Sequence, residues 1–404
     1  MNKKFCPHCY PILNHRLHLA ERFDNFLSPC HSFFEFLARP LKKNYRLFAY
    51  LNRKFFYGLF KMFLKLRLFK EVEIVEKGKN IHSRTLVIIK EAKKRNLIIR
   101  KIEFLGKTTN FFSLMLEMKN YYFEGLPHLD IGHTTYIDFD DKYEFKKILK
   151  KNNIPHTIGK KLRNYKEAYK LARKIGFPLV VKPLRGSLSQ HITVNIISFE
   201  KLKKAVKIAK QISLYFVLER YIPGKNYRIM VVDKKFVACC LRELPNIIGD
   251  GRHNIVELIK IKNKNILRGD AFDRSFTLHK IIISRKMLSI LKKQDLSLKN
   301  IPERRKKIYL DDKIILACGA DIHDKTEDMH PLNKILFEKI AGLCKTSVIG
   351  FDFIADDISR PYLEQECALI EANSMPNIDM HHFPTFGSPQ NVAGRIIDFV
   401  TAKK

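Results

Sequence analysis

The chain alternates between two hydrophobic patterns from residue 142 to residue 241, and each pattern predicts one kind of element. Apolar residues recur at helical spacing in three segments, which are Lys142–Asn152, Asn164–Ile175 and Phe199–Gln211. Short apolar runs bounded by Gly, Pro or polar residues predict strands, and these runs are Leu179–Pro183, His191–Ile197, Leu214–Tyr221 and Arg228–Leu241. We expect Pro223-Gly224 to join the last two strands. The pattern predicts a domain of mixed helices and strands.

A smaller unit precedes this domain. His82–Arg95 has helical periodicity, whereas Leu97–Phe104 and Asn120–Phe123 are strand-like. Pro127 and Gly132 then interrupt the pattern, as is typical of a linker. We therefore place a small α/β domain at residues 76–137 and the main domain at residues 138–404. Within the main domain, a charged stretch at about residues 263–313, densest from Lys292 to Lys313, predicts an insertion or a flexible connection.

Residues 1–75 differ from the rest and form a basic, amphipathic helical extension in this interpretation. From Leu41 to Lys70, aromatic and aliphatic residues alternate with Lys and Arg, and acidic residues are absent. Such helices either lie on an anionic membrane or pack onto the neighbouring domain, so residues 41–70 leave a peripheral membrane contact open. A zinc site is also left open, because Cys6-Pro7-His8-Cys9 precedes an irregular pair, Cys30 and His31.

Composition bounds the class of protein. A chain of 404 residues that is 46% hydrophobic can bury a large core and should contain more than one domain. Its 8 Cys include single or adjacent residues within apolar runs, and no secretory pattern is apparent, which predicts a cytoplasmic protein with reduced thiols. No apolar run is long enough to span a bilayer.

The net charge of +34 fits an anionic partner, but the lysines are spread along the chain. We therefore attribute them to solvated helix faces and expect no nucleic-acid partner.

Two apolar segments near residue 360 carry polar residues that suggest a metal site. Asp352 lies within Gly350–Ile354, and Glu371 and Asn373 lie within Ala368–Asn373. On a strand, residues i and i+2 share a face, so Glu371 and Asn373 point the same way. A carboxylate in an apolar strand is costly unless something pairs with it. If the two strands are neighbours, three oxygen donors converge as Mg²⁺ requires. The alternative is that both carboxylates face water at strand ends.

Two further segments suggest nucleotide contacts. Lys182 ends an apolar strand just before the loop Arg185–Gln190, where loop N–H groups and an ammonium can together bind phosphate. Phe216–Gly224 is an apolar strand that turns into a loop, and backbone groups at such a crossover can bind an adenine edge. The alternatives are a lysine that reaches water from a strand end and an ordinary hairpin.

These segments occur in an order that resembles the ATP-grasp superfamily, most closely the ATP-grasp module of cyanophycin synthetases and related carboxylate–amine ligases. The resemblance covers roughly residues 138–404. The similar strings are Val181–Leu184, Glu219–Gly224 with Tyr227-Arg228, Gly249–Ile255 with Glu257–Ile259, Asp324–Thr326 with Met329–Pro331, and Glu371–Pro376 with Met380-His381 and Pro384–Gly387.

The resemblance implies an α+β ATP-grasp fold, in which two subdomains clamp ATP, preceded by the small α/β domain. It implies ATP and Mg²⁺ (or Mn²⁺) as cofactors. It also implies three groups of binding residues. The phosphates would be bound by Lys142, Lys182 and Ser187, and the nucleoside by Glu219, Arg220, Ile222 and Asn226. The metal would be bound by Asp352, Glu371 and Asn373. The implied reaction joins a carboxylate to an amine through an acylphosphate, with an amino acid or peptide as substrate. We also expect a homo-oligomer.

The sequence departs from the family pattern in three places. Leu188, Gln190 and His191 stand where the phosphate loop usually has glycine, and bulky side chains hinder close backbone approach to phosphate. Asn226 stands where an acidic ribose contact is common. Asp311–Gly319 lacks the arginine that steadies the acylphosphate, and Arg228 or Arg242 is expected to supply that charge.

Two functions therefore stay open from the sequence. The first is an ATP-dependent ligase. The second is an ATP-binding protein with weakened catalysis and a regulatory or membrane-associated role. A Mur-ligase-like domain, which follows this module in cyanophycin synthetases, is missing from the sequence, so polymerisation of cyanophycin is not expected.

Overall fold

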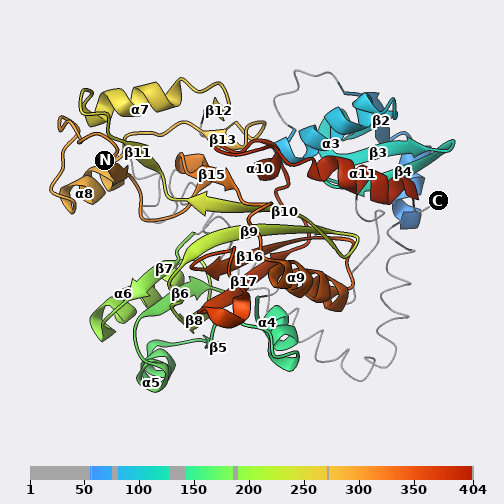
Figure 1. The fold of residues 1–404 in the computed structure, drawn as a ribbon. Coiled ribbons are helices and arrows are strands. Elements are labelled where there is room, and N and C mark those ends of the chain that lie inside the picture. The colour runs from blue at the N-terminus through green and yellow to red at the C-terminus, as the bar shows by residue number, and fades with distance from the viewer. Residues whose placement is uncertain are drawn as a thin grey trace.

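The computed structural model describes residues 55, 57–74, 81–127, 142–184, 190–270 and 273–402. Figure 1 shows an N-terminal α/β domain in blue and cyan, a small sheet in green, and a larger sheet whose strands run from yellow-green to red. A further unit, drawn in yellow and orange, projects from the larger sheet. The cysteines at the start of the chain and most of the basic extension lie outside the described residues, as does Ser187.

The N-terminal domain is an antiparallel sheet in the order β1-β2-β3-β4 with one covering helix. Its elements are β1 (Phe69–Glu73), α3 (Ser83–Lys94), β2 (Ile99–Phe104), β3 (Lys107–Leu116) and β4 (Lys119–Glu124). The predicted helix and two predicted strands are confirmed. Strands β1 and β3 were not predicted, and β1 lies inside the segment interpreted as a helical extension.

Residues 57–65 are helical and pack onto the N-terminal sheet. Phe60 is 5% exposed, and its ring centroid lies 5.0 Å from that of Phe69 and 5.2 Å from that of Tyr122. Phe63 also contacts Phe69, at 5.6 Å. The aromatic side chains of this helix therefore stabilise the neighbouring N-terminal domain. For these residues, this favours packing onto the neighbouring domain over lying on a membrane. Among the described helices, none has the length and apolar character that a membrane span needs.

The small sheet has the antiparallel order β5-β8-β6-β7. Its elements are β5 (Gly159–Leu162), α5 (Tyr165–Ile175), β6 (Leu179–Pro183), β7 (Thr193–Ile196), α6 (Phe199–Ala209) and β8 (Phe216–Arg220). Asn164 and Ser198 cap the two helices by accepting hydrogen bonds from the third helical backbone N–H. Alanines and leucines on the inner faces of α5 and α6 pack against the sheet as one core.

The large sheet has the antiparallel order β15-β10-β9-β16-β17. Its strands are β9 (Lys225–Val232), β10 (Lys235–Glu243), β15 (Asp321–Asp324), β16 (Val348–Ala355) and β17 (Cys367–Asn373). Helices α4 (Lys142–Lys151) and α9 (Pro331–Cys344) cover one face, where Phe145, Phe337 and Phe351 meet in a shared core. A short helix, η3 (Tyr362–Glu364), joins β16 to β17.

The single strand predicted from Arg228 to Leu241 is wrong. The chain turns at Asp233 and Lys234, whose φ angles are +48° and +61°. Two consecutive residues with positive φ form the turn that matches the twist of an antiparallel hairpin. Asp tolerates this conformation, so no glycine was needed to mark the turn.

Between β10 and β15 the chain folds into an inserted unit with its own core. Its elements are β11 (Asn246–Ile248), α7 (Ile255–Asn263), β12 (Arg268–Gly269), β13 (Leu278–His279), α8 (Arg285–Lys292), β14 (Lys307–Tyr309) and η2 (Leu316–Cys318). Ile247, Ile259, Leu291 and Ile308 are among its buried residues. The charged stretch is thus folded rather than a flexible connection, and the unit begins before residue 263. Asn254 and Glu257 form a capping box at the start of α7, which gives the Gly249–Glu257 string a structural role.

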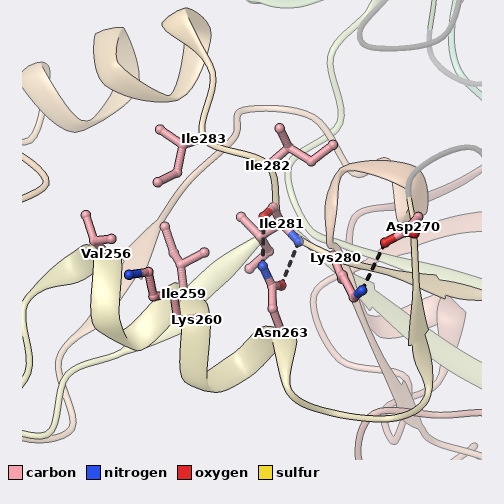
Figure 2. A pocket seen from close by; sticks show the side chains of 9 residues that line it. All are labelled: Val256, Ile259, Lys260, Asn263, Asp270, Lys280, Ile281, Ile282 and Ile283. Atoms are coloured by element: carbon pink, nitrogen blue, oxygen red, sulfur yellow. Dashed lines mark hydrogen bonds and ion pairs between the residues drawn. The ribbon is translucent and has the colours of Figure 1, made fainter.

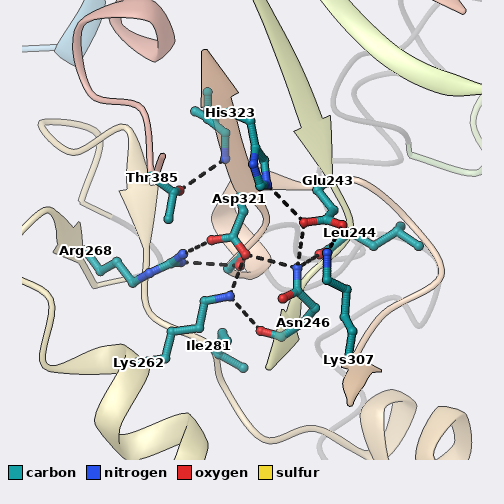
Figure 3. Close-up of polar contacts among 12 residues, drawn as sticks. Glu243, Leu244, Asn246, Lys262, Arg268, Ile281, Lys307, Asp321, His323 and Thr385 are labelled. Atoms are coloured by element: carbon teal, nitrogen blue, oxygen red, sulfur yellow. Dashed lines mark hydrogen bonds and ion pairs between the residues drawn. The ribbon is translucent and has the colours of Figure 1, made fainter. Parts of the chain in front are cut away.

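Buried charges attach the inserted unit to the large sheet (Figure 3). Asp321 of β15 is fully buried and pairs with Arg268 and with Lys262, whose ammonium lies 2.5 Å away. Across the strand pair, Glu243 accepts from Lys307 at 2.6 Å and contacts His323 at 3.0 Å. Because the buried Asp321 and the partly buried Glu243 each pair with cations, this junction holds the unit in a defined position.

A hollow of about 500 Å³ lies on the inserted unit beside α7 (Figure 2). Its lining is mostly isoleucine, including Ile281, Ile282 and Ile283. The side-chain amide of Asn263 donates to the carbonyl of Ile281 at 2.9 Å and accepts from the backbone N–H of Ile281 at 2.8 Å. Lys280 pairs with Asp270 at 2.9 Å. None of the predicted site residues lines this hollow.

The last helix completes the N-terminal domain. α10 (Asp379–His382) follows β17, and α11 (Val392–Ala402) lies against α3 (Figure 1). Ile396, Ile397 and Val400 share one core with Val87, Ile88 and other residues of the N-terminal domain, and with Met230 and Val348 of the large sheet.

Candidate active site

The predicted metal residues lie on one face of the large sheet. In the register of β9, β16 and β17, Arg228 lies opposite Asp352, and Asp352 lies opposite Glu371. Asn373 follows two residues after Glu371 and therefore shares its face. Directly opposed side chains have Cβ atoms about 4.5–5.5 Å apart, close enough for the three polar groups to interact.

Two arginines hold the Asp352 carboxylate. Arg228 Nη1 lies 3.0 Å from Asp352 Oδ1, and Arg242 Nη2 lies 2.7 Å from Oδ2. Burial by itself would raise the pKa of Asp352, but the charges of Arg228 and Arg242 outweigh it and lower that pKa. Asp352 is 8% exposed. The carboxylate is therefore ionised in a buried place, and the two arginines predicted from the sequence lie beside it.

Gly350 explains how Arg228 fits. A Cβ at this position would lie 3.2 Å from Arg228 Nη1 and 2.7 Å from Cβ of Pro376. A side chain would therefore collide with the loop that follows Asn373 and crowd the guanidinium. Strand β16 therefore needs glycine at this position. The Arg228 guanidinium of the neighbouring strand lies next to the space that a side chain would have filled.

Helix α4 connects the two sheets through lysines one turn apart. Lys142 Nζ lies 3.5 Å from Glu371 Oε2 of the large sheet. Lys146 forms an ion pair with Glu219 of the small sheet, and Lys182 Nζ lies 3.0 Å from the same Glu219 oxygen. Sequence reasoning missed Lys146, although its i+4 spacing from Lys142 places both side chains on one helix face.

Glu219 is buried between its two lysines. Its carboxylate is 2% exposed, Lys182 is 3% exposed and Lys146 is 8% exposed. Burial would raise the pKa of Glu219, yet Lys182 and Lys146 lower it to about 2. Burial lowers the pKa of Lys146 to about 8, against the attraction of Glu219. Two cations against one carboxylate leave this cluster with excess positive charge.

The other residues predicted to contact the nucleotide lie near the end of β8 or beyond it. Arg220 is half exposed, 3.9 Å from Glu366, and Ile222 is buried. The side-chain oxygen of Asn226 accepts a hydrogen bond from Arg242 Nε at 2.9 Å, which orients that arginine. Asn226 therefore has a structural partner in addition to its predicted ribose contact.

The string Asp324–Pro331 is used in the fold. Thr326 Oγ1 donates to Asp324 Oδ1 at 2.6 Å and accepts from the backbone of Cys239 at 3.1 Å. His330 caps α9, and Pro331 is its first residue. These contacts fix the turn between β15 and α9. They give the residues of this string a structural role rather than a chemical one.

His381 of α10 is a buried histidine, 2% exposed, and neither ring nitrogen has a hydrogen-bond partner among the described residues. Burial, together with the nearby charges of Arg228, His382 and Arg242, lowers its pKa to about 3. The imidazole is therefore neutral at neutral pH.

This burial predicts acid sensitivity. The folded pKa of His381 is below its unfolded value of about 6.5, so the unfolded chain binds the extra proton and stability falls as the pH drops from 6.5 toward 3. At pH 5 the expected loss is about 2 kcal/mol relative to pH 7. Urea unfolding at both pH values measures it. His381→Asn should remove this part of the difference, and an equal difference in both proteins would contradict the assignment.

The comparisons with known proteins agree with this fold. Residues 139–266 match the family model of the RimK-like ATP-grasp domain. The chain contains an ATP-grasp domain. It is 34% identical over 263 residues to cyanophycin synthetase of Trichormus variabilis, covering 64% of this chain and 29% of that protein. It is 30% identical over 368 residues to the glutathione biosynthesis bifunctional protein GshAB of Clostridium perfringens, covering 90% of this chain and 46% of that protein.

A solved structure gives the same result for the fold. The crystal structure of a bifunctional glutathione synthetase from Pasteurella multocida has a TM-score of 0.63 and 25% identity, and covers 81% of this chain and 45% of that one. The chain thus spans less than half the length of these relatives. The predicted α+β ATP-grasp fold and the predicted resemblance to the cyanophycin synthetase branch are confirmed.

ATP-grasp ligases in general use ATP and Mg²⁺, and the site has the donor set for that pair. Among the described residues, no three His, Cys, Asp or Glu side chains form a group that could by itself hold a metal ion. The face carries two carboxylates and an amide instead. Mg²⁺ at nucleotide sites is usually bound by one or two carboxylates together with substrate phosphates, so this set fits.

Proposed function

We propose that this protein is an ATP-dependent ligase that joins a carboxylate to an amine, with an amino acid or peptide as substrate. The observation that carries the proposal is the pair of charged clusters linked by α4. Lys146 and Lys182 surround Glu219 on the small sheet, and Lys142 reaches Glu371 on the large sheet. A triphosphate between the two sheets would meet cations on one side and metal-binding oxygens on the other.

The lysines would bind the phosphates. The Lys182 ammonium is buried, and its ion pair with Glu219 at 3.0 Å involves a single oxygen, so other N–H donors of this ammonium are left for an anion. Lys142 and Lys146 would add charge from α4, and Arg220, Ile222 and Asn226 would contact the nucleoside. Ser187 and the N–H groups of its loop are predicted to bind the phosphates.

The metal would be held by Asp352, Glu371 and Asn373. When bound, Mg²⁺ (or Mn²⁺) would neutralise the phosphate charge that develops during transfer. Asp352 shares its charge with Arg228 and Arg242, which leaves Glu371 as the carboxylate with the weaker ion pair. This arrangement fits a site completed by metal and phosphates together.

The two arginines would steady the reacting groups. In the first step, an oxygen of the substrate carboxylate bonds to the γ-phosphorus and ADP leaves. In the second, the amine nitrogen bonds to the acyl carbon, phosphate leaves, and the nitrogen loses a proton. Arg228 and Arg242 carry positive charge where the acylphosphate and its tetrahedral successor would form. They would replace the arginine that the Asp311–Gly319 segment lacks.

Three further expectations belong to this proposal. A homo-oligomer, a cytoplasmic location and a peripheral membrane contact through residues 41–70 remain predictions. The packing of Phe60 and Phe63 onto the N-terminal sheet leaves fewer apolar side chains of that segment for a membrane.

The test is ATP binding by calorimetry with and without Mg²⁺, followed on the same sample by phosphate release with a panel of amino acids and dipeptides. We expect Mg-dependent binding, and release that requires one acceptor pair. Binding without release across the panel would instead support an ATP-binding protein with weakened catalysis. Absence of binding would contradict both functions.

A further inference from the structure

The N-terminal domain holds the connecting segment, residues 374–378, that follows the predicted metal residues. This segment joins the end of β17 at Asn373 to the start of α10 at Asp379. Arg84 Nη1 donates to the carbonyl of Met375 at 2.8 Å, and Ser83 Oγ donates to Asp379 Oδ2 at 2.6 Å. Ser83 and Arg84 are the first two residues of α3, which lies beside α10 (Figure 1). The start of one helix thus holds the connecting segment near both of its ends.

The middle of the connecting segment is packed on two sides. Pro376 lies against β16, where a Cβ on Gly350 would come 2.7 Å from the Cβ of Pro376. The backbone N–H of Ile378 donates to the carbonyl of Pro376 at 3.0 Å. The Ile378 side chain is fully buried in the core that α3, α11 and the N-terminal sheet share. The segment therefore follows a defined path between the large sheet and the N-terminal domain.

Gly125 of the N-terminal domain keeps Arg84 in its place. Thr85 Oγ1 of α3 donates to the carbonyl of Gly125 at 3.0 Å, which holds the residue after β4 against the helix. A Cβ on Gly125 would lie 2.7 Å from Met375 Cε and 3.4 Å from Arg84 Nη2. Gly125 has a φ of +65°, a conformation that glycine adopts readily. Arg84 and Met375 therefore both pack closely against a backbone position that has no side chain.

The inserted unit supports the same contact at the start of α10. Thr277 Oγ1 donates to Asp379 Oδ2 at 2.6 Å, the oxygen that also accepts from Ser83. The backbone N–H of Ser83 donates to the carbonyl of Arg274 at 2.8 Å. Asp379 is 3% exposed, so Oδ2 depends on these hydroxyl groups in place of water. The N-terminal domain and the inserted unit together fix the start of α10.

The contacts of α3 lie close to the predicted metal residues in the chain. Met375 follows Asn373 by two residues, and Asn373 shares a face of β17 with Glu371. Mg²⁺ demands near-ideal octahedral geometry, so a small displacement of one ligand weakens its binding. Groups that orient metal ligands typically contribute about 10–100-fold to metal affinity.

We propose that Arg84 and Ser83 are positioning residues for the metal, because they fix the path of the chain at Asn373 through the Met375 carbonyl and Asp379. The inference rests on the proposed function, since it takes Asn373 as a metal-binding residue. It goes further by making the N-terminal domain a part of the metal site. The domain then contributes to nucleotide binding without contacting the nucleotide.

The experiment measures how much Mg²⁺ nucleotide binding requires. The affinity of the full chain for a non-hydrolysable ATP analogue is measured by calorimetry, first without Mg²⁺ and then at rising Mg²⁺ concentrations. Arg84→Met should need about tenfold or more Mg²⁺ to reach half of the full gain in affinity. Without Mg²⁺ it should bind the analogue like the wild type. An unchanged Mg²⁺ requirement would overturn the assignment.

Three more variants separate positioning from a general loss of structure. Arg84→Lys keeps a donor for the Met375 carbonyl and should recover most of the Mg²⁺ response. Ser83→Ala removes one donor from the carboxylate at the start of α10 and should shift the requirement in the same direction as Arg84→Met. The matched control is Arg95→Met, because Arg95 follows the other end of α3 and pairs with Asp398 of α11 at 2.5 Å. The control should respond like the wild type, and a shift as large as that of Arg84→Met would contradict the positioning role.

The outcomes separate this assignment from the ligase proposal. A shifted Mg²⁺ requirement in Arg84→Met, with no phosphate release by the wild type for any acceptor pair, supports the positioning role and contradicts the ligase. Release by the wild type with an unchanged Mg²⁺ requirement in the variant supports the ligase and contradicts the positioning role. Weaker binding by Arg84→Met without Mg²⁺ would also overturn the positioning role, because the effect would then be a general structural one. A wild type whose affinity does not respond to Mg²⁺ would overturn the positioning role together with the metal assignment.

Discussion

Replacing Glu371 with alanine is expected to abolish Mg-ATP-dependent ADP release, with a loss of roughly 10³-fold or more. Asp352 is already paired with Arg228 and Arg242, whereas the ion pair of Glu371 with Lys142 is longer, at 3.5 Å. Glu371 is thus the carboxylate most available to a metal. Without it, the remaining donors carry too little charge to hold Mg²⁺ against the phosphates.

Two measurements check this prediction. Turnover is followed by ADP release, and metal binding is followed separately as the gain in ATP affinity when Mg²⁺ is added. The variant should lose both. Glu366→Ala is the matched control, because Glu366 precedes β17 and is half exposed. Unchanged turnover in Glu371→Ala would remove the metal role from this residue.

The second large effect concerns Glu219, whose loss should destabilise the protein by about 3–5 kcal/mol. Its carboxylate neutralises Lys146 and Lys182, which are 8% and 3% exposed. Glu219→Ala leaves two buried ammonium groups without their shared counterion. The energy lost is then mainly the cost of keeping those charges away from water.

Urea unfolding of Glu219→Ala measures this loss. Glu200→Ala serves as the control in the same subdomain, because Glu200 pairs with Lys204 on the exposed surface of α6 and its removal should leave the unfolding midpoint unchanged. Mg-ATP should restore more stability to the Glu219 variant than to the wild type, since phosphate supplies the missing negative charge. Equal stabilisation by Mg-ATP would argue that the phosphates do not reach Lys146 and Lys182.

Local elements could be predicted well where one periodicity ran without interruption. Helices α4 and α5 and strand β6 lie within a residue or two of their predicted bounds. The break at Asp233-Lys234 was missed because no glycine or proline marks it, and the turn depends on positive φ at two ordinary residues. Strand β3 was missed because its sequence, Lys107–Leu116, lacks a clean alternation of apolar and polar positions.

The site could be predicted only as far as spacing within a single element reaches. Glu371 and Asn373 share a face by their i, i+2 spacing, and the sheet register then brings Asp352 opposite Glu371. Lys146 could have been found from its i+4 spacing to Lys142. The hydrogen bond between Ser83 and Asp379 could not, because contacts between residues almost 300 positions apart depend on domain packing that no local pattern encodes.

The shared core of α11 and the N-terminal domain has a consequence for how the protein is made. Val392–Ala402 leaves the ribosome about 270 residues after β4, which at roughly 5–20 residues per second is a delay of about 13–54 seconds. During that time Val87, Ile88 and their neighbours lack the apolar surface that Ile396, Ile397 and Val400 later provide. The N-terminal domain is therefore completed only after the ATP-grasp core has been synthesised, and its unfinished apolar surface is where a nascent-chain chaperone would bind.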